Sequence, residues 1–293
     1  MSSHTEHPSS LVATDGRKIK IGDLTLDIIS VGGYYTCIQL PKHKIVFDMG
    51  ICPKEAFRSK YVFFTHPHPD HMSGFIQHLS TREMIGAGKS TYVMEDIHVA
   101  YFEDILNGWR RISRCSLQCE IVGITQKEEF SVSKNHLIVP FRSVHRIPCL
   151  GYTLFHIKKK LLPEFQGQSS QKIIAAKSMG KDIHLYERIP LVSVTGDTTH
   201  HVFERNPEIL KSNVLVTEVT FFGDDVSPEQ ATAQGHMHIN DLIRFEDAFL
   251  HTKLVIMHIS ARYKTAEVEE IVRKRFSKRV HKNITIVPNT MIV

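Results

Sequence analysis

Six consecutive residues restrict the fold of this chain more than any other feature, namely His66, Pro67, His68, Pro69, Asp70 and His71. They follow the apolar run Tyr61–Thr65, which is typical of a buried β-strand, and a helix is expected to begin behind them. Side chains two residues apart in extended chain point the same way, so His66 and His68 can grip one metal ion. Asp70 and His71 come as the chain turns and can face a second ion. The fold must therefore bring further ligands to this loop.

Later segments offer those ligands at the ends of predicted strands or in the loops behind them. They contribute His145, Asp197, His258 and the neighbouring pair His236 and His238. Histidine is the commonest metal ligand, and this chain has 19 histidines. Any one of these residues alone is more often structural, but together with the loop at 66–71 they form a set.

The candidate ligands divide between two ions, the first held by His66, His68 and His145 and the second by Asp70, His71 and His258. Asp197 can bridge them because a carboxylate has two acceptor oxygens. Zinc suits these nitrogen and oxygen donors, and manganese (Mn²⁺) and iron are alternatives. Two cations lower the pKa of a shared water towards neutrality, which produces a hydroxide nucleophile, and they stabilise the negative charge of a transition state. Phosphodiester hydrolysis is the reaction for which paired metals are most often used.

The remaining pattern predicts an α/β protein of layered sheets with helices outside. The predicted strands are Leu24–Ser30, Tyr35–Leu40, Lys44–Phe47, Tyr61–Thr65, Glu120–Ile124, Phe130–Ser133, His136–Val139, Tyr152–Ile157, Leu191–Val194, Val214–Val219, Leu254–Ile259 and Ile284–Val287. The predicted helices are Met72–Leu79, Glu95–Leu106, Ile239–Leu250 and Thr265–Phe276. Residues 1–18 are expected to form a flexible leader, and 19–293 a single domain. The polar segment Lys158–Asp182 is expected to be a loop or short-helix insertion.

Composition narrows the setting without fixing the function. The net charge of +5 permits a polyanionic partner but does not demand one. Five cysteines with irregular spacing indicate free thiols in a reducing compartment. No apolar run is long enough to span a membrane, and residues 1–10 do not resemble a signal peptide. We therefore expect a soluble, intracellular and cytoplasmic protein without a membrane partner, with the nucleus or an organelle as alternatives.

The ligand set resembles that of the metallo-β-lactamase superfamily, and within it the ribonuclease Z family of tRNA 3′-processing endonucleases. The finer resemblance rests on four stretches, His145–Tyr152, Thr195–Thr198, Glu218–Phe221 and His258–Tyr263. It implies one domain with a four-layer αββα sandwich and a site at one edge of the two sheets. It also implies that Asp70, Glu218 and His236 are catalytic, with Glu218 and His236 donating a proton to the leaving oxygen. Asp48 resembles the family's carboxylate that orients a ligand histidine.

The sequence departs from the family pattern at three places. Ribonuclease Z usually carries a Gly/Pro-rich flexible arm that grips tRNA, and the segment Lys158–Asp182 is too short and too poor in these residues, so the arm is expected to be missing. Thr217 stands where the family has histidine. Met237 and His238 stand where it has serine and threonine.

A basic run at 273–279 can contact phosphates, but the solvated face of a helix is the simpler interpretation.

These features predict a dinuclear, ribonuclease Z-like phosphodiesterase that acts on pre-tRNA 3′ ends, with RNA as partner. One alternative is a hydrolase of the same fold for another phosphodiester, an ester or a thioester. Another is a non-catalytic nucleic-acid-binding relative. The resemblance also implies a homodimer, since members of the family commonly form one.

Overall fold

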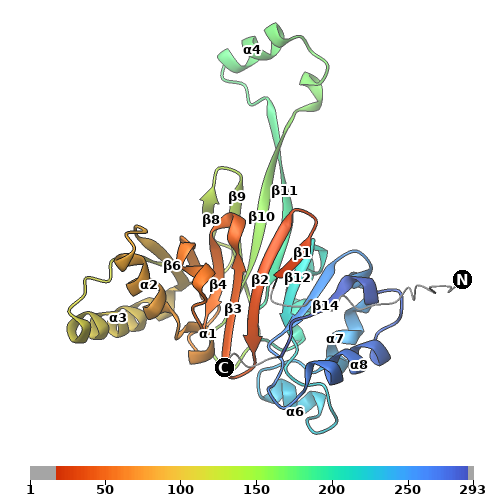
Figure 1. Ribbon diagram of the computed structural model, residues 1–293. Helices are drawn as coiled ribbons and strands as arrows, with labels where there is room; N and C mark the ends of the chain where they lie inside the picture. Colours follow the sequence, from red (N-terminus) through yellow and green to blue (C-terminus); the bar gives the residue numbers. More distant parts are fainter. Residues whose placement is uncertain (1–17, 290–293) are drawn as a thin grey trace, which may run out of the picture.

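In a computed structural model, residues 18–289 form two seven-stranded β-sheets that pack face to face (Figure 1). The first sheet runs in chain order through β1 (Lys18–Ile21), β2 (Leu24–Val31), β3 (Tyr35–Leu40), β4 (Ile45–Met49), β5 (Tyr61–Phe63), β6 (Ser90–Glu95) and β7 (Cys119–Ile124). The second runs in reverse chain order through β14 (Ile284–Ile286), β13 (Lys253–Met257), β12 (Val214–Glu218), β11 (His184–Val194), β10 (Leu150–Leu161), β9 (His136–Arg142) and β8 (Phe130–Ser133).

Helices cover the outer faces of both sheets. The first sheet carries α1 (Pro69–Met72), α2 (Phe75–Met84) and α3 (Val99–Ser113), and the second carries α5 (His201–Arg205), α6 (Pro228–Ala233), α7 (Ile239–Leu242) and α8 (Thr265–Arg275). A further helix, α4 (Ser170–Ser178), lies apart from both. Short 3-10 turns complete the chain: η1 (Pro41–His43), η2 (Lys54–Arg58), η3 (Asp96–His98), η4 (Pro163–Phe165), η5 (Pro207–Lys211), η6 (Ile243–Leu250) and η7 (His281–Asn283). The predicted four-layer α/β architecture is confirmed.

Alternation along the strands separates three apolar layers. In β4, Ile45 and Phe47 face the space between the sheets, whereas Val46 faces the helices. Successive side chains of a strand point to opposite faces, and both faces here are covered, so the strand is apolar throughout. Between the sheets, the ring of Tyr152 lies 5.4 Å from that of Phe63 and 5.9 Å from that of Phe47, centroid to centroid. These contacts fix the two sheets against each other.

Parallel pairing directs several strands to the same edge of the sandwich. β4, β5, β6 and β7 are parallel, as are β11, β12, β13 and β14. Loops that follow the carboxyl ends of parallel strands converge, and ligands of open α/β sheets bind there. The loops after β4, β5, β11, β12 and β13 carry most of the residues that the sequence singles out.

The segment predicted to lack an arm forms one. β10 and β11 continue past the sheets as a two-stranded ribbon, paired as far as Leu161 and His184, and the ribbon carries η4 and α4 at its far end (Figure 1). We call residues 158–187 the arm. The expectation of a missing arm is therefore wrong, because a ribbon of paired strands takes the place of Gly/Pro-rich flexible chain.

Other expectations are tested by the same residues. The strand β6 was not predicted, and the helix expected over 239–250 divides into α7 and η6. The leader at 1–18 lies outside the described residues except for Lys18, which begins β1. Within residues 18–289 no disulfide forms, and none of the helices is both long and apolar enough to cross a bilayer.

Candidate metal centre

The loop at 66–71 joins the end of β5 to α1. Thr65 is held in place by Asp48 of β4, whose Oδ1 accepts the Thr65 N–H at 2.7 Å and whose Oδ2 accepts its hydroxyl at 2.8 Å. His68 then occupies the residue before α1, and Pro69 takes the first helical position, where its missing N–H costs nothing. The histidines of the loop thus start from a fixed strand end.

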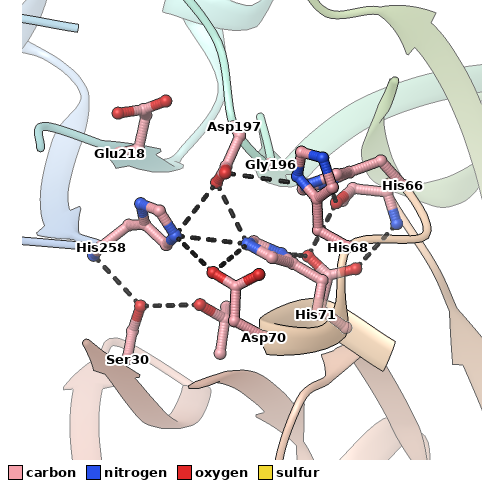
Figure 2. Close-up of polar contacts among 12 residues, drawn as sticks. Ser30, His66, His68, Asp70, His71, Gly196, Asp197, Glu218 and His258 are labelled. Atoms are coloured by element: carbon pink, nitrogen blue, oxygen red, sulfur yellow. Dashed lines mark hydrogen bonds and ion pairs between the residues drawn. The ribbon is translucent and has the colours of Figure 1, made fainter. Parts of the chain in front are cut away.

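The second sheet supplies the partners of this loop. Asp197 follows β11, Glu218 ends β12, His258 follows β13, and His145 lies between β9 and β10. Figure 2 shows Asp197 and His258 converging on His71 and Asp70. The structure therefore brings together the seven residues that the sequence assigns to the two ions.

One group of donor atoms surrounds His66. Its Nε2 lies 2.9 Å from Nδ1 of His68 and 3.7 Å from Oδ2 of Asp197, and Nε2 of His145 lies 3.4 Å from Nδ1 of His68. These four residues can share an ion, because their donor atoms lie within 4.8 Å of one another.

A second group surrounds His71. Its Nε2 lies 3.3 Å from Nε2 of His258 and 3.6 Å from Oδ2 of Asp70, and the last two atoms are 3.4 Å apart. The other oxygen of Asp197, Oδ1, is 3.2 Å from Nε2 of His71 and 3.4 Å from that of His258. The two oxygens of Asp197 therefore face different groups, which is the arrangement of a bridging carboxylate.

The hydrogen bonds behind the histidines decide which nitrogen faces inward. Nδ1 of His71 donates to Asp48 at 2.8 Å, and Nδ1 of His145 donates to the Gly235 carbonyl at 2.8 Å. The Thr65 hydroxyl already donates to Asp48, so it accepts the Nδ1–H of His66 at 3.0 Å. Each of these rings then presents an Nε2 lone pair to the centre, as metal-ligating histidines do.

His258 follows the same rule through a residue that the sequence analysis missed. Thr220 donates its hydroxyl hydrogen to Oε2 of Glu218 at 2.6 Å, and its oxygen lies 3.2 Å from Nδ1 of His258, whose N–H it accepts. The signal for Thr220 was its place within the stretch Glu218–Phe221. Its role depends on a contact with a residue 38 positions away, which local sequence does not reveal.

The electrostatics of the centre favour a cation. Burial opposes a charge on His71, but the carboxylates of Asp197 and Asp48 outweigh it and raise the His71 pKa well above its ordinary value. Burial likewise opposes ionisation of Asp197, but His258 and His71 hold the pKa of that carboxyl well below its ordinary range. Oδ1 of Asp197 is buried and has no hydrogen-bond partner among the described residues. A buried carboxylate oxygen without a hydrogen-bond partner needs a positive charge beside it. Histidine lone pairs that point to the same place could hold a divalent ion there.

Glu218 and His236 form a pair at the rim. Oε1 of Glu218 accepts the Nδ1–H of His236 at 2.9 Å and the Thr198 N–H at 2.7 Å, while Oε2 accepts the Thr220 hydroxyl and the Met237 N–H. Burial lowers the pKa of His236, but Glu218 outweighs it and raises that pKa to about 9. The His236 side chain is 20 % exposed and can therefore meet a substrate.

Two positions that depart from the family pattern have structural roles. His238 accepts the Asn240 N–H with Nδ1 at 3.2 Å, as the cap of α7, and its Nε2 donates to the Gly223 carbonyl at 3.1 Å. It therefore contributes no donor to the centre. Thr217 is buried, and its hydroxyl oxygen accepts a hydrogen bond from the Thr195 hydroxyl at 3.1 Å.

The close approach of loop and strand explains one glycine. A Cβ on Gly50 would overlap the backbone oxygen of Asp70, so only glycine lets β4 and α1 meet.

Asp48 and His258 adopt left-handed backbone with φ of 54° and 56°. Such conformations are uncommon for residues with a side chain, and here they aim two functional groups inward.

The chain is similar to several known proteins, although no protein-family model matches it. It is 33 % identical over 258 residues to tRNase Z TRZ1 of Arabidopsis thaliana, covering 87 % of this chain and 92 % of that protein. It is 30 % identical to the chloroplastic tRNase Z TRZ2 of the same plant, covering 93 % and 78 % respectively.

Solved structures show the same fold. The metallo-β-lactamase fold protein YhfI of Bacillus subtilis superposes with a TM-score of 0.61 at 12 % identity, covering 89 % of this chain and 95 % of that one. The short form of human tRNase Z superposes with a TM-score of 0.55 at 14 % identity, covering 92 % and 98 %. The fold is thus that of the metallo-β-lactamases, as the resemblance implies.

Proposed function

This chain belongs to the ribonuclease Z family of metal-dependent endoribonucleases, and we propose that it cleaves pre-tRNA at its 3′ end. The observation that carries the proposal is Asp197, whose two oxygens face two separate groups of inward-pointing histidines. The Glu218–His236 pair beside them adds an acid for the leaving group.

We assign one ion to His66, His68 and His145, the other to Asp70, His71 and His258, and the bridge to Asp197. Zinc suits these donors, and Mn²⁺ or iron are alternatives. Two ions held by these residues would supply an activated water and would offset the negative charge of the phosphate. Asp70 lies in α1 and contributes its Oδ2 to the second group of donor atoms. The Gly33 N–H donates a hydrogen bond to the same oxygen at 3.2 Å.

His236 acts on the leaving oxygen. Its Nδ1–H is committed to Glu218, so Nε2 carries the proton that can be donated. Glu218 accepts four hydrogen bonds. Its carboxylate raises the pKa of His236 to about 9, so His236 is protonated near neutral pH. His236, Asp197 and His258 also form a third group whose donor atoms lie close together, so a ligand role for His236 is the competing assignment.

The arm supports RNA as the substrate. It holds six lysines against three carboxylates and extends away from the body (Figure 1). Lysines in extended positions bind phosphates by charge and without regard to sequence. The two Arabidopsis relatives are named tRNase Z, and tRNA is a substrate of the same class.

We propose that two copies of this chain form a homodimer, and α3 offers a surface for it. Its outer side exposes the apolar side chains of Tyr101, Ile105, Trp109 and Ile112. Asp104 and Arg111 flank this stripe on one side, because seven residues make almost two helical turns. Two copies of α3 that pack antiparallel would pair Asp104 of each with Arg111 of the other.

The compartment is also a proposal. The relatives include a protein named chloroplastic and one named nuclear, so the expected intracellular setting extends to cytoplasm, nucleus and organelle.

Cleavage of a 3′-extended pre-tRNA, with and without a chelator, tests the function. We expect one cut near the 3′ end that the chelator abolishes and added Zn²⁺ restores. Bis(p-nitrophenyl) phosphate serves as the second substrate. Turnover of that ester without pre-tRNA cleavage would favour the alternative of another phosphodiester. Failure on both substrates with metal bound would leave the ester, thioester and non-catalytic alternatives.

A further inference from the structure

A second cluster of histidines lies where the arm leaves the body. His43 ends η1 of the first sheet, His136 opens β9, and His156 stands opposite His136 on β10. The cluster is remote from the metal centre: Leu150, six residues before His156, bonds the Thr65 carbonyl beside that centre. Six residues of strand span about 20 Å. The three histidines line a cavity of about 680 Å³.

The two strand histidines have the spacing of a chelating pair. Nδ1 of His156 lies 3.3 Å from Nε2 of His136. Two imidazole nitrogens that bind one tetrahedral zinc ion at about 2.0–2.1 Å stand about 3.3 Å apart. A hydrogen bond between the rings would use one of these nitrogens as donor, whereas an ion would use both as lone-pair ligands.

The surroundings of His136 fix the nitrogen that it offers. The Ser133 hydroxyl lies 3.1 Å from Nδ1 of His136. With Ser133 as the acceptor of the Nδ1–H, the lone pair of Nε2 faces His156. A hydrogen bond behind a ligand histidine in this way sets its tautomer and orientation.

His43 lies next to this pair. Its ring lies edge-on to that of His136, with 4.8 Å between centroids. His43 lies in η1, which joins β3 and β4 of the first sheet, and the other two histidines lie in strands of the second sheet. An ion bound by all three would therefore link the two sheets at the base of the arm.

The charge state of the cluster favours a metal over an anion. Burial, and then the neighbouring imidazole of His136, lowers the pKa of His43. Burial, and then His156, lowers the pKa of His136. Both rings are therefore neutral near pH 7. Neutral imidazole is the form that binds transition metals, and it attracts phosphates weakly.

We propose that His136 and His156, with His43 as third ligand, bind one divalent transition-metal ion at the base of the arm. The ion is of the borderline class that prefers imidazole, with Zn²⁺ as the probe, and water from the cavity completes its coordination. This site is additional to the metal centre and takes no part in the cleavage chemistry.

Counting bound ions tests the proposal. Protein without an affinity tag is dialysed against Zn²⁺, and zinc per chain is measured for the parent, His136→Gln and His156→Gln. We expect each variant to hold one ion fewer than the parent while its hydrolysis of bis(p-nitrophenyl) phosphate is unchanged. His251→Gln, which alters another residue of the same cavity, is the matched control and should hold as many ions as the parent.

A milder variant guards against loss of folding. Ser133 is exposed, and Ser133→Ala should weaken only the additional ion, by about tenfold. Equal zinc counts and affinities in the parent and all three variants would overturn the site and leave a hydrogen-bonded histidine pair. The count does not depend on catalysis. Active variants with full zinc content refute this site alone, and an inactive parent that loses an ion on His156→Gln refutes the proposed function alone.

Discussion

The candidate metal centre and the arm are built in opposite ways. In the metal centre, His66, His71 and Asp197 are at most 2 % exposed, and the backing residues Thr65 and Asp48 are fully buried. In the arm, α4 contributes no buried residue, and Ile174 and Met179 are 66 % and 77 % exposed. The centre is held by both sheets, whereas the arm depends on the pairing of two strands.

This contrast separates two requirements of the enzyme. Ligands must be preorganised, because free rotation of a histidine would cost binding energy at each ion. An element that follows a long nucleic acid needs reach and charge rather than a core. Changes at the centre should therefore affect every substrate, and changes in the arm should affect only a large one.

The largest effect should come from the bridging carboxylate. Asp197→Ala removes the oxygen ligands that face both groups, so we expect loss of at least one ion per chain. Metal ions contribute several kcal/mol to such reactions, and hydrolysis of both substrates should fall by at least about 10³-fold. Metal analysis and initial rates measure this, with Asp182→Ala in the arm as control. Parental metal content in Asp197→Ala would contradict the ligand assignment.

The acid pair should give the next largest effect. His236→Ala removes the donor to the leaving oxygen, and general acids contribute about 10²–10⁴-fold. We expect pre-tRNA cleavage to fall within that range while both ions stay bound. Glu218→Gln should act in the same direction, because the raised pKa of His236 depends on the Glu218 charge. Loss of an ion from His236→Ala would instead support the competing ligand role.

The sequence predicted which side chains converge at the candidate metal centre, because these residues follow strand ends. The ligands of the 66–71 loop lie next to each other in the chain, and the others follow runs whose apolar character marks them as strands. Asp48 was also singled out from the sequence, and the structure shows its hydrogen bond to His71. Thr198 depends on a contact with Glu218, 20 residues away in the chain, and Thr220 on a contact with His258, 38 residues away. No local pattern encodes such contacts.

The arm was predicted wrongly for a related reason. Low Gly and Pro content argues against flexible chain, but it does not argue against strands that pair beyond the sheet. The pairing of Lys158 with Glu187 joins residues almost thirty positions apart. β6 was missed because Ser90, Thr91 and Glu95 reduce its apolar run to three residues, although all three polar residues are buried.

Shortening the arm should separate the two substrates. Ile157 and Arg188 are partners in register, so residues 158–187 can be replaced by an Asn-Gly turn that closes a two-residue hairpin. We expect kcat/KM for pre-tRNA to fall by about 10²-fold, because the lysines of the arm are lost. Hydrolysis of bis(p-nitrophenyl) phosphate should stay at the parental rate. Full pre-tRNA cleavage by the shortened chain would show that the body alone binds the RNA.

The smallest effect compares one helix cap in each region. Ser227 caps α6 in the body, accepting the Gln230 N–H at 3.2 Å, and Ser169 caps α4 in the arm, accepting the Lys172 N–H at 3.5 Å. Removing a serine cap costs about 1 kcal/mol. Ser227→Ala should lower the free energy of unfolding by that amount, measured in guanidinium chloride. Ser169→Ala should leave the same quantity unchanged, because the arm tip opens locally before the body unfolds. Equal losses in both variants would mean that the arm tip unfolds together with the sandwich, and the contrast between the two regions would then fail.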